Sequence, residues 1–363
     1  MLDRPLVSRD KYPHRAAHIH GLIEAGEDDG LAAELVELAA ANGDVWRYDG
    51  AIVSAELLAL PDARRCALTL RVIERATAAA PPVPVGRLLV QIGRGIPAGA
   101  LSWGAARYLI DAVSTWSTER PETLAVLAEV AERETGECPP ALLAVIRRTA
   151  HDVDKRWPTG ASDPLRPWLD RFPGRLNVGE AWAEAADAET PGPELIAHAL
   201  TASGAKPASR WAQHSKDLLP DLGGDATRAL IRRWLALVPR PRTIPLAAGD
   251  RFDPNEVPDP HNAKALRGLL YLLAVTPSRE DDVAAVGRLV QYSGEKVPGH
   301  GPRSQMLAHA GIYALERFST VPALREMARL RSLGQPPGIG AALTGAIARR
   351  SVALGVDPAR LAQ

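Results

Sequence analysis

The chain has 363 residues, of which 46% are hydrophobic, and its 43 basic residues balance 43 acidic ones. A net charge of zero provides no overall field that would attract nucleic acid or an anionic membrane, so any such binding has to be local. Cys66 and Cys138 lie in unrelated segments, which indicates a reducing compartment rather than a disulfide or metal framework. The chain has no run of eighteen apolar residues and no signal-peptide core near its start, so we expect a cytoplasmic protein that does not enter a membrane.

The first clear helical pattern begins at Pro121. Apolar residues keep helical spacing from there to Thr135, and Gly136 supplies a stop. A second stretch starts at Pro139 and Pro140 and ends before Trp157 and its following proline. The sequence therefore predicts two antiparallel helices joined by a short turn.

A second pair of helices is predicted after Pro207. Trp211 and His214 share a face with the leucines that follow, and we expect Asp225 to cap the next helix, which carries Trp234. Because Trp211 and Trp234 occupy apolar helical positions, both are predicted to pack in the core between repeats.

The segment from Val238 to Pro260 interrupts this pattern with prolines and glycine, and it is the best candidate for a boundary. A second break is expected near residue 158. We therefore predict three parts: N-terminal helical repeats in 1–158, middle repeats in 159–240 and C-terminal repeats in 241–363. Asp259 is expected to cap the next helix, whose stretch LRGLLYLLAV (266–275) is apolar almost all round, as in the middle of a stack.

The fold class predicted from these patterns is all-α, as an α-solenoid of stacked antiparallel helix pairs of the HEAT or armadillo kind. Helix formers dominate the composition, whereas Phe (3) and Tyr (6) are scarce. We expect about eighteen helices, without the strict period of tetratricopeptide or ankyrin repeats.

Basic residues outnumber acidic ones between Lys206 and Arg242, which predicts a basic stripe on one surface or, more simply, a solvated helix face. The candidate basic surface consists of Arg210, Lys216, Arg228, Arg232, Arg233, Arg240 and Arg242.

The most unusual segment is SGEKVPGHGPRS (293–304). Lys296, Arg303 and Ser304, together with two glycines, precede a predicted helix whose first amides lack partners, a combination that suits a bound phosphate or carboxylate. The simpler interpretation is a turn between repeats that needs glycine for positive φ.

Other motifs point to no chemistry. His14 and His18, one helical turn apart, have no acidic or thiol partner at metal-ligand spacing, so we expect no metal site and no cofactor. The glycine cluster QIGRGIPAG (91–99) lacks the ending of a phosphate-binding loop and is predicted to form helix stops and turns. No catalytic triad pattern is present.

Three stretches carry a resemblance: KPASRWAQHSKDLLPDLGGDATRALIRRWLALVP, DPHNAKALRGLLYLLA and EKVPGHGPRSQMLAHAGIYAL. They resemble the helical region that precedes the conserved domain in large bacterial proteins similar to a molybdate-metabolism regulator (MolR-like). The resemblance covers about the second half of the chain, with Val297–Ser304 its most specific part. It implies a bacterial scaffold module, either standing alone or separated from a C-terminal domain of unknown function, and it implies no catalytic residue.

The leading functional hypothesis is a non-enzymatic helical-repeat scaffold that binds a protein partner, since stacked helix pairs expose a long surface. The second hypothesis is nucleic-acid binding through the basic surface. The third is an enzyme whose site assembles from distant residues and is not visible as a motif.

Overall fold

The computed structural model describes residues 13–42, 50–156, 160–248, 252–277 and 279–357. Within these residues the chain forms eighteen α-helices and one short two-stranded hairpin, so the predicted all-α class is confirmed. None of the helices in these ranges is long and apolar enough to cross a membrane. The chain divides into two compact units, one of residues 1–149 and 159–166, the other of residues 150–158 and 167–363.

The first unit is built from short helices in two rows. α1, α3 and α5 pack in one row, α2, α4 and α6 in the other, and α7 packs on α6. The bounds are α1 (Pro13–Ala25), α2 (Asp28–Asn42), α3 (Gly50–Ala59), α4 (Asp62–Ala78), α5 (Gly86–Ile92), α6 (Trp103–Ser114) and α7 (Pro121–Thr135), with a 3-10 turn at Asp163–Leu165. α8 (Pro140–Arg156) begins in this unit and ends in the second.

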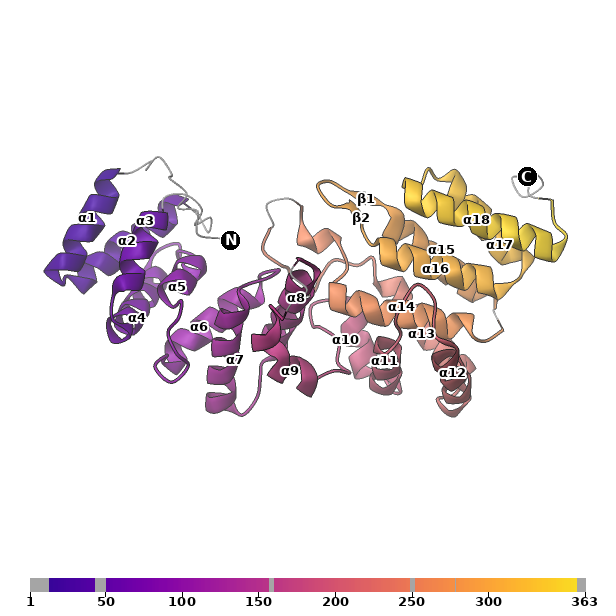
Figure 1. The fold of residues 1–363 in the computed structure, drawn as a ribbon, viewed down its shortest axis with the longest axis horizontal. Helices are drawn as coiled ribbons and strands as arrows, with labels where there is room; N and C mark the ends of the chain where they lie inside the picture. The colour runs from indigo at the N-terminus through magenta and orange to yellow at the C-terminus, as the bar shows by residue number, and fades with distance from the viewer. Residues whose placement is uncertain (1–12, 43–49, 157–159, 249–251, 278, 358–363) are drawn as a thin grey trace. The chain divides into compact units, whose positions relative to one another are not determined.

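The second unit contains two longer rows of helices. α10, α13, α15 and α17 pack successively in one row, and α11, α14, α16 and α18 in the other (Figure 1). The bounds are α9 (Arg166–Arg171), α10 (Ala181–Ala188), α11 (Gly192–Leu200), α12 (Ser209–Asp221), α13 (Asp225–Leu237), α14 (Pro260–Ala274), α15 (Glu280–Gly294), α16 (Gln305–Phe318), α17 (Val321–Ser332) and α18 (Pro337–Leu354), with a 3-10 turn at Pro254–Glu256.

A single apolar core runs between these two rows, and it includes residues from both sides of the 238–260 loop. α14 lies in its middle and is buried along almost its whole length, as its apolar sequence predicts. The loop predicted as a boundary therefore lies inside the second unit, and the three-part division stays a prediction.

Close helix packing in this core depends on glycine. A Cβ added to Gly268 of α14 would overlap the carbonyl oxygen of Ala199 in α11, and one added to Gly311 of α16 would overlap the side chain of Val290 in α15. Only a residue without a side chain lets these helix axes approach so closely.

Two predicted features near helix ends differ in outcome. Asp259 caps α14, because its carboxylate accepts hydrogen bonds from the amides of His261 and Asn262. Asp225 is not a cap, and that prediction is wrong: Gly224 occupies the cap position, while the Asp225 carboxylate pairs with Arg279. The tight turn at Gly223 and Gly224, both with positive φ, moves Asp225 into the first helical turn.

Candidate functional sites

The segment predicted to bind an anion forms a β-hairpin. β1 (Lys296–Val297) pairs antiparallel with β2 (Gly301–Pro302), with Lys296 opposite Pro302. Gly299 and Gly301 have φ of 76° and 101°, so the turn does require glycine. The hairpin lies between α15 and α16 and joins the two rows of helices (Figure 1).

The side chain of Arg303 makes three contacts with residues in or near the hairpin. Its Nε lies 3.2 Å from a carboxylate oxygen of Glu295, its Nη1 donates to the carbonyl oxygen of Glu256, and its guanidinium lies 4.9 Å from the ring centre of Tyr292. These contacts attach the hairpin to the 3-10 turn of the preceding loop. An anion would have to compete with Glu295 for the same positive charge.

The other two residues of the predicted anion site have different surroundings. Ser304 is the N-cap of α16, and its hydroxyl accepts a hydrogen bond from the amide of Leu307 at 3.3 Å. Lys296 is exposed on β1. Because two of the three polar groups already have structural partners, the geometry favours a turn, and the anion site stays a prediction.

The candidate basic surface consists largely of arginines that pair inside the second unit. Arg228 and Arg232 of α13 both bind the carboxylate of Asp282 in the first turn of α15, the second at 2.7 Å. Asp282 is fully buried, and the side chain of Arg228 is only 6% exposed. Burial alone would raise the pKa of Asp282, but hydrogen bonds from Arg228 and Arg232 lower it.

Two more of these arginines face carboxylates. Arg233 lies 2.5 Å from Glu189, and Arg242 lies 3.6 Å from Glu180 with its own side chain 5% exposed. The remaining residues of the set, Arg210, Lys216 and Arg240, are exposed. The structure therefore does not combine the seven side chains into one open basic face.

A buried polar network surrounds Glu180, just before α10. Its carboxylate accepts hydrogen bonds from the Asp259 amide at 2.7 Å, the Asn262 side chain at 2.8 Å and the Trp182 indole at 3.0 Å. Asn177 completes the network by donating to the Asp259 carboxylate at 2.9 Å. Burial, followed by the charge of Asp259, raises the pKa of Glu180. The network fixes the start of α14 against the start of α10, which is a structural role.

A series of rings crosses α11, α12, α14 and α16 on the second unit. His198 stacks on Trp211 with ring centres 4.7 Å apart and contacts His214 edge-on at 5.0 Å. Trp211 in turn meets Tyr271 at 6.3 Å, and Tyr271 meets Tyr313 at 5.3 Å. Of these, Tyr271 is buried, His214 is exposed, and the other three are half-buried.

Arg267 and Met306 adjoin these rings. The guanidinium of Arg267 lies 3.5 Å from the Met306 sulfur and also donates to the Ala202 carbonyl, while the Tyr271 hydroxyl donates to the Gly204 carbonyl at 3.1 Å. The side chains of Arg267 and Met306 are half-buried. We call the set His198, Trp211, His214, Arg267, Tyr271, Met306 and Tyr313 the aromatic face.

Sequence reasoning missed this face. Trp211 was expected in the core, but it is half-buried at the surface, where its indole nitrogen donates to the Thr201 hydroxyl at 2.9 Å. The spacing of Trp211 and His214, one helical turn apart, is the only local signal. Tyr271 and Tyr313 join them only because α14 and α16 pack side by side.

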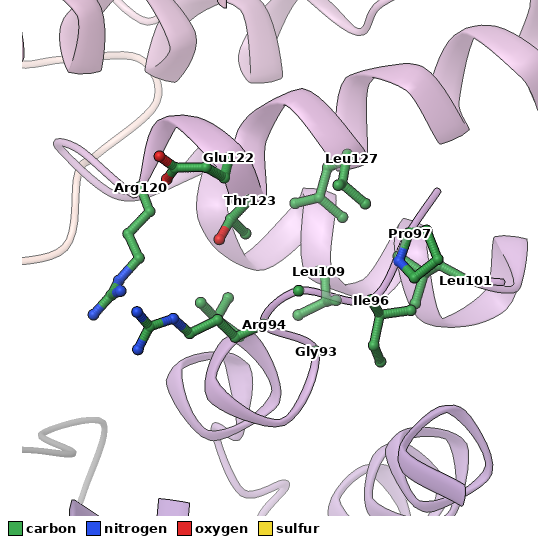
Figure 2. A pocket seen from close by; sticks show the side chains of 13 residues that line it. Gly93, Arg94, Ile96, Pro97, Leu101, Leu109, Arg120, Glu122, Thr123 and Leu127 are labelled. Atoms are coloured by element: carbon green, nitrogen blue, oxygen red, sulfur yellow. The ribbon is translucent and has the colours of Figure 1, made fainter. Parts of the chain in front are cut away.

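The first unit contains a pocket of about 400 Å³ that is lined in part by the middle of the glycine cluster 91–99 (Figure 2). Its walls come from α5, α6, α7 and the loop that joins α5 to α6, namely from Val90, Gly93, Arg94, Gly95, Ile96, Pro97, Leu101, Leu109, Arg120, Glu122, Thr123, Val126 and Leu127. Gly93 caps α5 and Gly95 has a φ of 74°, so the predicted helix stop and turn are confirmed.

Two arginines hold the loop of this pocket. Buried Arg65 of α4 donates to the carbonyl oxygens of Ile92, at 3.0 Å, and Arg94, at 2.6 Å. Arg133 of α7 donates to the carbonyl oxygen of Ala98 at 2.8 Å. Side chains from α4 and α7 thereby hold the loop at both ends.

The histidines near the start of the chain show no metal site in the described residues. The side chain of His14 lies outside them, His18 is exposed, and His20 lies 3.3 Å from Glu24 and 3.2 Å from Glu56. No group of three potential ligands from His, Cys, Asp and Glu occurs in the part of the chain that the structure describes.

No protein-family model, curated protein or solved structure matches this chain. The resemblance to the helical region of MolR-like bacterial proteins therefore stays a prediction.

Proposed function

We propose that the protein is a cytoplasmic α-solenoid scaffold, of the HEAT or armadillo kind, that binds a protein partner through the aromatic face. The two rows of helices in the second unit support the solenoid, because each helix packs on the next of its own row and on its neighbour in the other row. The aromatic face itself is the observation that carries the proposal.

The composition of this face suits a protein interface. Tyr, Trp, Met and Arg are the residue types enriched at protein interfaces and at their energetic centres. Here Trp211, Tyr313, Arg267 and Met306 are half-buried and held by neighbours, so little side-chain entropy is lost when a partner covers them.

The charge next to the rings indicates the chemistry of the partner. Lys264 and Arg267 lie on the same stripe of α14, and both are half-buried. Burial, and then the charge of Arg267, lowers the pKa of Lys264, while the charges of Asp154 and Asp259 oppose this shift. The two cations on this stripe suit an acidic partner segment. The partner segment that fits combines an aromatic or apolar side chain with a nearby Asp or Glu.

The test uses the wild-type protein and its variants as bait in extracts of the native host, and mass spectrometry compares the proteins that each bait captures. Trp211→Ala and Tyr313→Ala should lose the partner, while Leu333→Ala, which removes an exposed apolar side chain at the end of α17, should retain it. Each variant is first checked for an unchanged unfolding midpoint. Retention of the same partner by both face variants, or its loss with Leu333→Ala alone, would contradict the proposal.

A further inference from the structure

The pocket of the first unit presents two arginine side chains that lack carboxylate partners. Arg94 follows α5 and Arg120 precedes α7, and in the described part of the chain neither guanidinium has a hydrogen bond or ion pair. Figure 2 shows both guanidinium groups turned toward the same side of the pocket, while the Glu122 carboxylate points elsewhere. Two cations on one side repel each other, and a bound anion between them would relieve that repulsion.

The start of α7 adds to this attraction. Arg120 is the N-cap of α7 but provides no side-chain hydrogen bond, so the amides of Glu122 and Thr123 in the first turn have no cap. Thr123 also lines the pocket, and Figure 2 shows its hydroxyl turned toward Arg94 rather than away from the pocket. Donors from two guanidinium groups, a hydroxyl and a helix start are thus gathered at one end.

The rest of the pocket is apolar. Val90, Ile96, Leu101, Leu109 and Leu127 form its wall, and all five side chains are buried. The volume of about 400 Å³ falls within the range of small-molecule sites, roughly 300 to 1,000 Å³. A ligand with one charged end and an apolar body matches this division into a cationic end and an apolar wall.

The charged side chains that line the pocket indicate which charge a bound ligand should carry. Arg94 and Arg120 are the cations of the lining and Glu122 is its acid, so the lining carries a net charge of +1, which one negative charge on the ligand neutralises. A carboxylate also matches the paired donors of a guanidinium group.

We propose that this pocket binds an apolar monocarboxylate, with the carboxylate between Arg94 and Arg120 and the chain along the apolar wall. The site lies within the first unit and is independent of the protein partner proposed for the aromatic face of the second.

The probe for this proposal is octanoate, titrated into the full-length protein by isothermal calorimetry. Octanoate should bind saturably, and Arg94→Gln or Arg120→Gln should weaken binding by about tenfold or more, since each removes a hydrogen bond to a charged group. Both side chains are exposed, so neither change should disturb folding. Arg107→Gln removes an exposed arginine of α6 outside the lining and should leave the affinity unchanged.

Two further ligands and one variant complete the test. Octanol should bind at least about tenfold more weakly than octanoate, octyl phosphate should bind no tighter than octanoate at pH 8, and Val126→Trp should block binding by filling the pocket while keeping both arginines. The proposal is overturned if octanoate does not bind, if the arginine variants bind as wild type does, or if octyl phosphate is preferred.

Discussion

Replacing Asp282 by Asn tests whether the arginines of α13 serve stability or a binding surface. The buried carboxylate accepts from Arg232 at 2.7 Å and from the amide of Arg279 at 2.9 Å, and it also binds Arg228. Asn keeps the shape but leaves the Arg228 guanidinium, 6% exposed, without a counter-charge. Breaking a buried ion pair in this way costs about 3 to 5 kcal/mol, so the unfolding equilibrium should shift by a factor of at least about 100.

The assay is urea denaturation followed by circular dichroism, with the double variant Arg228→Met/Asp282→Leu as the matched control. Replacing both partners by apolar residues removes the buried Arg228 charge and leaves only Arg232, whose side chain is 21% exposed and can be hydrated, so part of the stability lost in Asp282→Asn should be recovered. A loss below about 1 kcal/mol for Asp282→Asn, or no recovery in the double variant, would refute the assignment of Arg228 to a buried structural pair.

The pH dependence gives an independent check of the same pair. Because the pKa of Asp282 lies below its ordinary value of 3.8 in the folded protein, the unfolded chain takes up the proton first as pH falls. The stability that this pair contributes is fully present above about pH 5 and is lost as pH falls through the folded pKa. The Asp282→Asn variant should therefore lose less stability than wild type between pH 5 and pH 3.

Four further measurements follow from individual contacts. Trp234→Ala should destabilise the second unit by about 3 to 5 kcal/mol in chemical denaturation, since its indole is fully buried and donates to Glu189; a loss under about 1 kcal/mol would place it outside the core. Gly268→Ala should lower the free energy of unfolding by roughly 1 to 3 kcal/mol and with it the thermal midpoint, because the added methyl group overlaps α11. Gly345→Ala should be neutral or slightly stabilising, because the added methyl group meets only the flexible end of an arginine in α18. Arg303→Gln should lower the thermal unfolding midpoint, and added phosphate should change the midpoint of the variant and of the wild type equally. If phosphate raises the midpoint of the wild type but not that of the variant, the predicted anion site is established instead. Burial, followed by the nearby His214, lowers the pKa of His198 from 6.5, so stability should fall as pH drops from about 6.5 through the lowered pKa, and His198→Gln should reduce that fall.

Helix boundaries set by local chemistry were predictable from the sequence. α7 runs from Pro121 to Thr135 and ends at Gly136 with a φ of 81°, as its proline start and glycine stop predict. The Asp259 cap follows from the same kind of signal. The Asp225 cap failed because the two glycines immediately before it make a tighter turn than a single cap residue implies, so that Gly224 takes the cap position.

The aromatic face shows the limit of periodicity. Spacing placed Trp211 and His214 on the apolar stripe of one helix, and such a stripe ordinarily packs in the core. Whether a stripe is covered depends on the neighbouring helix, and α12 packs on α14 at the edge of the second row rather than inside it. The half-exposed position of Trp211 is therefore a property of the packing, not of its own segment.

Charge in sequence is a poor guide to charge at the surface of this protein. The segment 206–242 is rich in arginine, yet four of its arginines meet Asp282, Glu189 or Glu180, all of which lie outside that segment. Pairing over such separations is set by which helices pack together, so no local count of charges detects it.

In the first unit, by contrast, the guanidinium groups of Arg94 and Arg120 make no ion pair within the described residues, although Arg120 stands between Glu119 and Glu122 in the sequence. Arg65 and Arg133, which hold the adjoining loop, donate to backbone carbonyls, so the loop is fixed without a carboxylate near Arg94. A guanidinium that folding has left without an internal acceptor keeps all its donors for a ligand. By that criterion the positive charge open to a small ligand lies beside the glycine loop of the pocket. Salt-dependent affinity for duplex DNA should be weak, because Arg210, Lys216 and Arg240 are the members of the candidate basic surface that are exposed and have no carboxylate partner among the described residues, whereas Arg233, also exposed, pairs with Glu189.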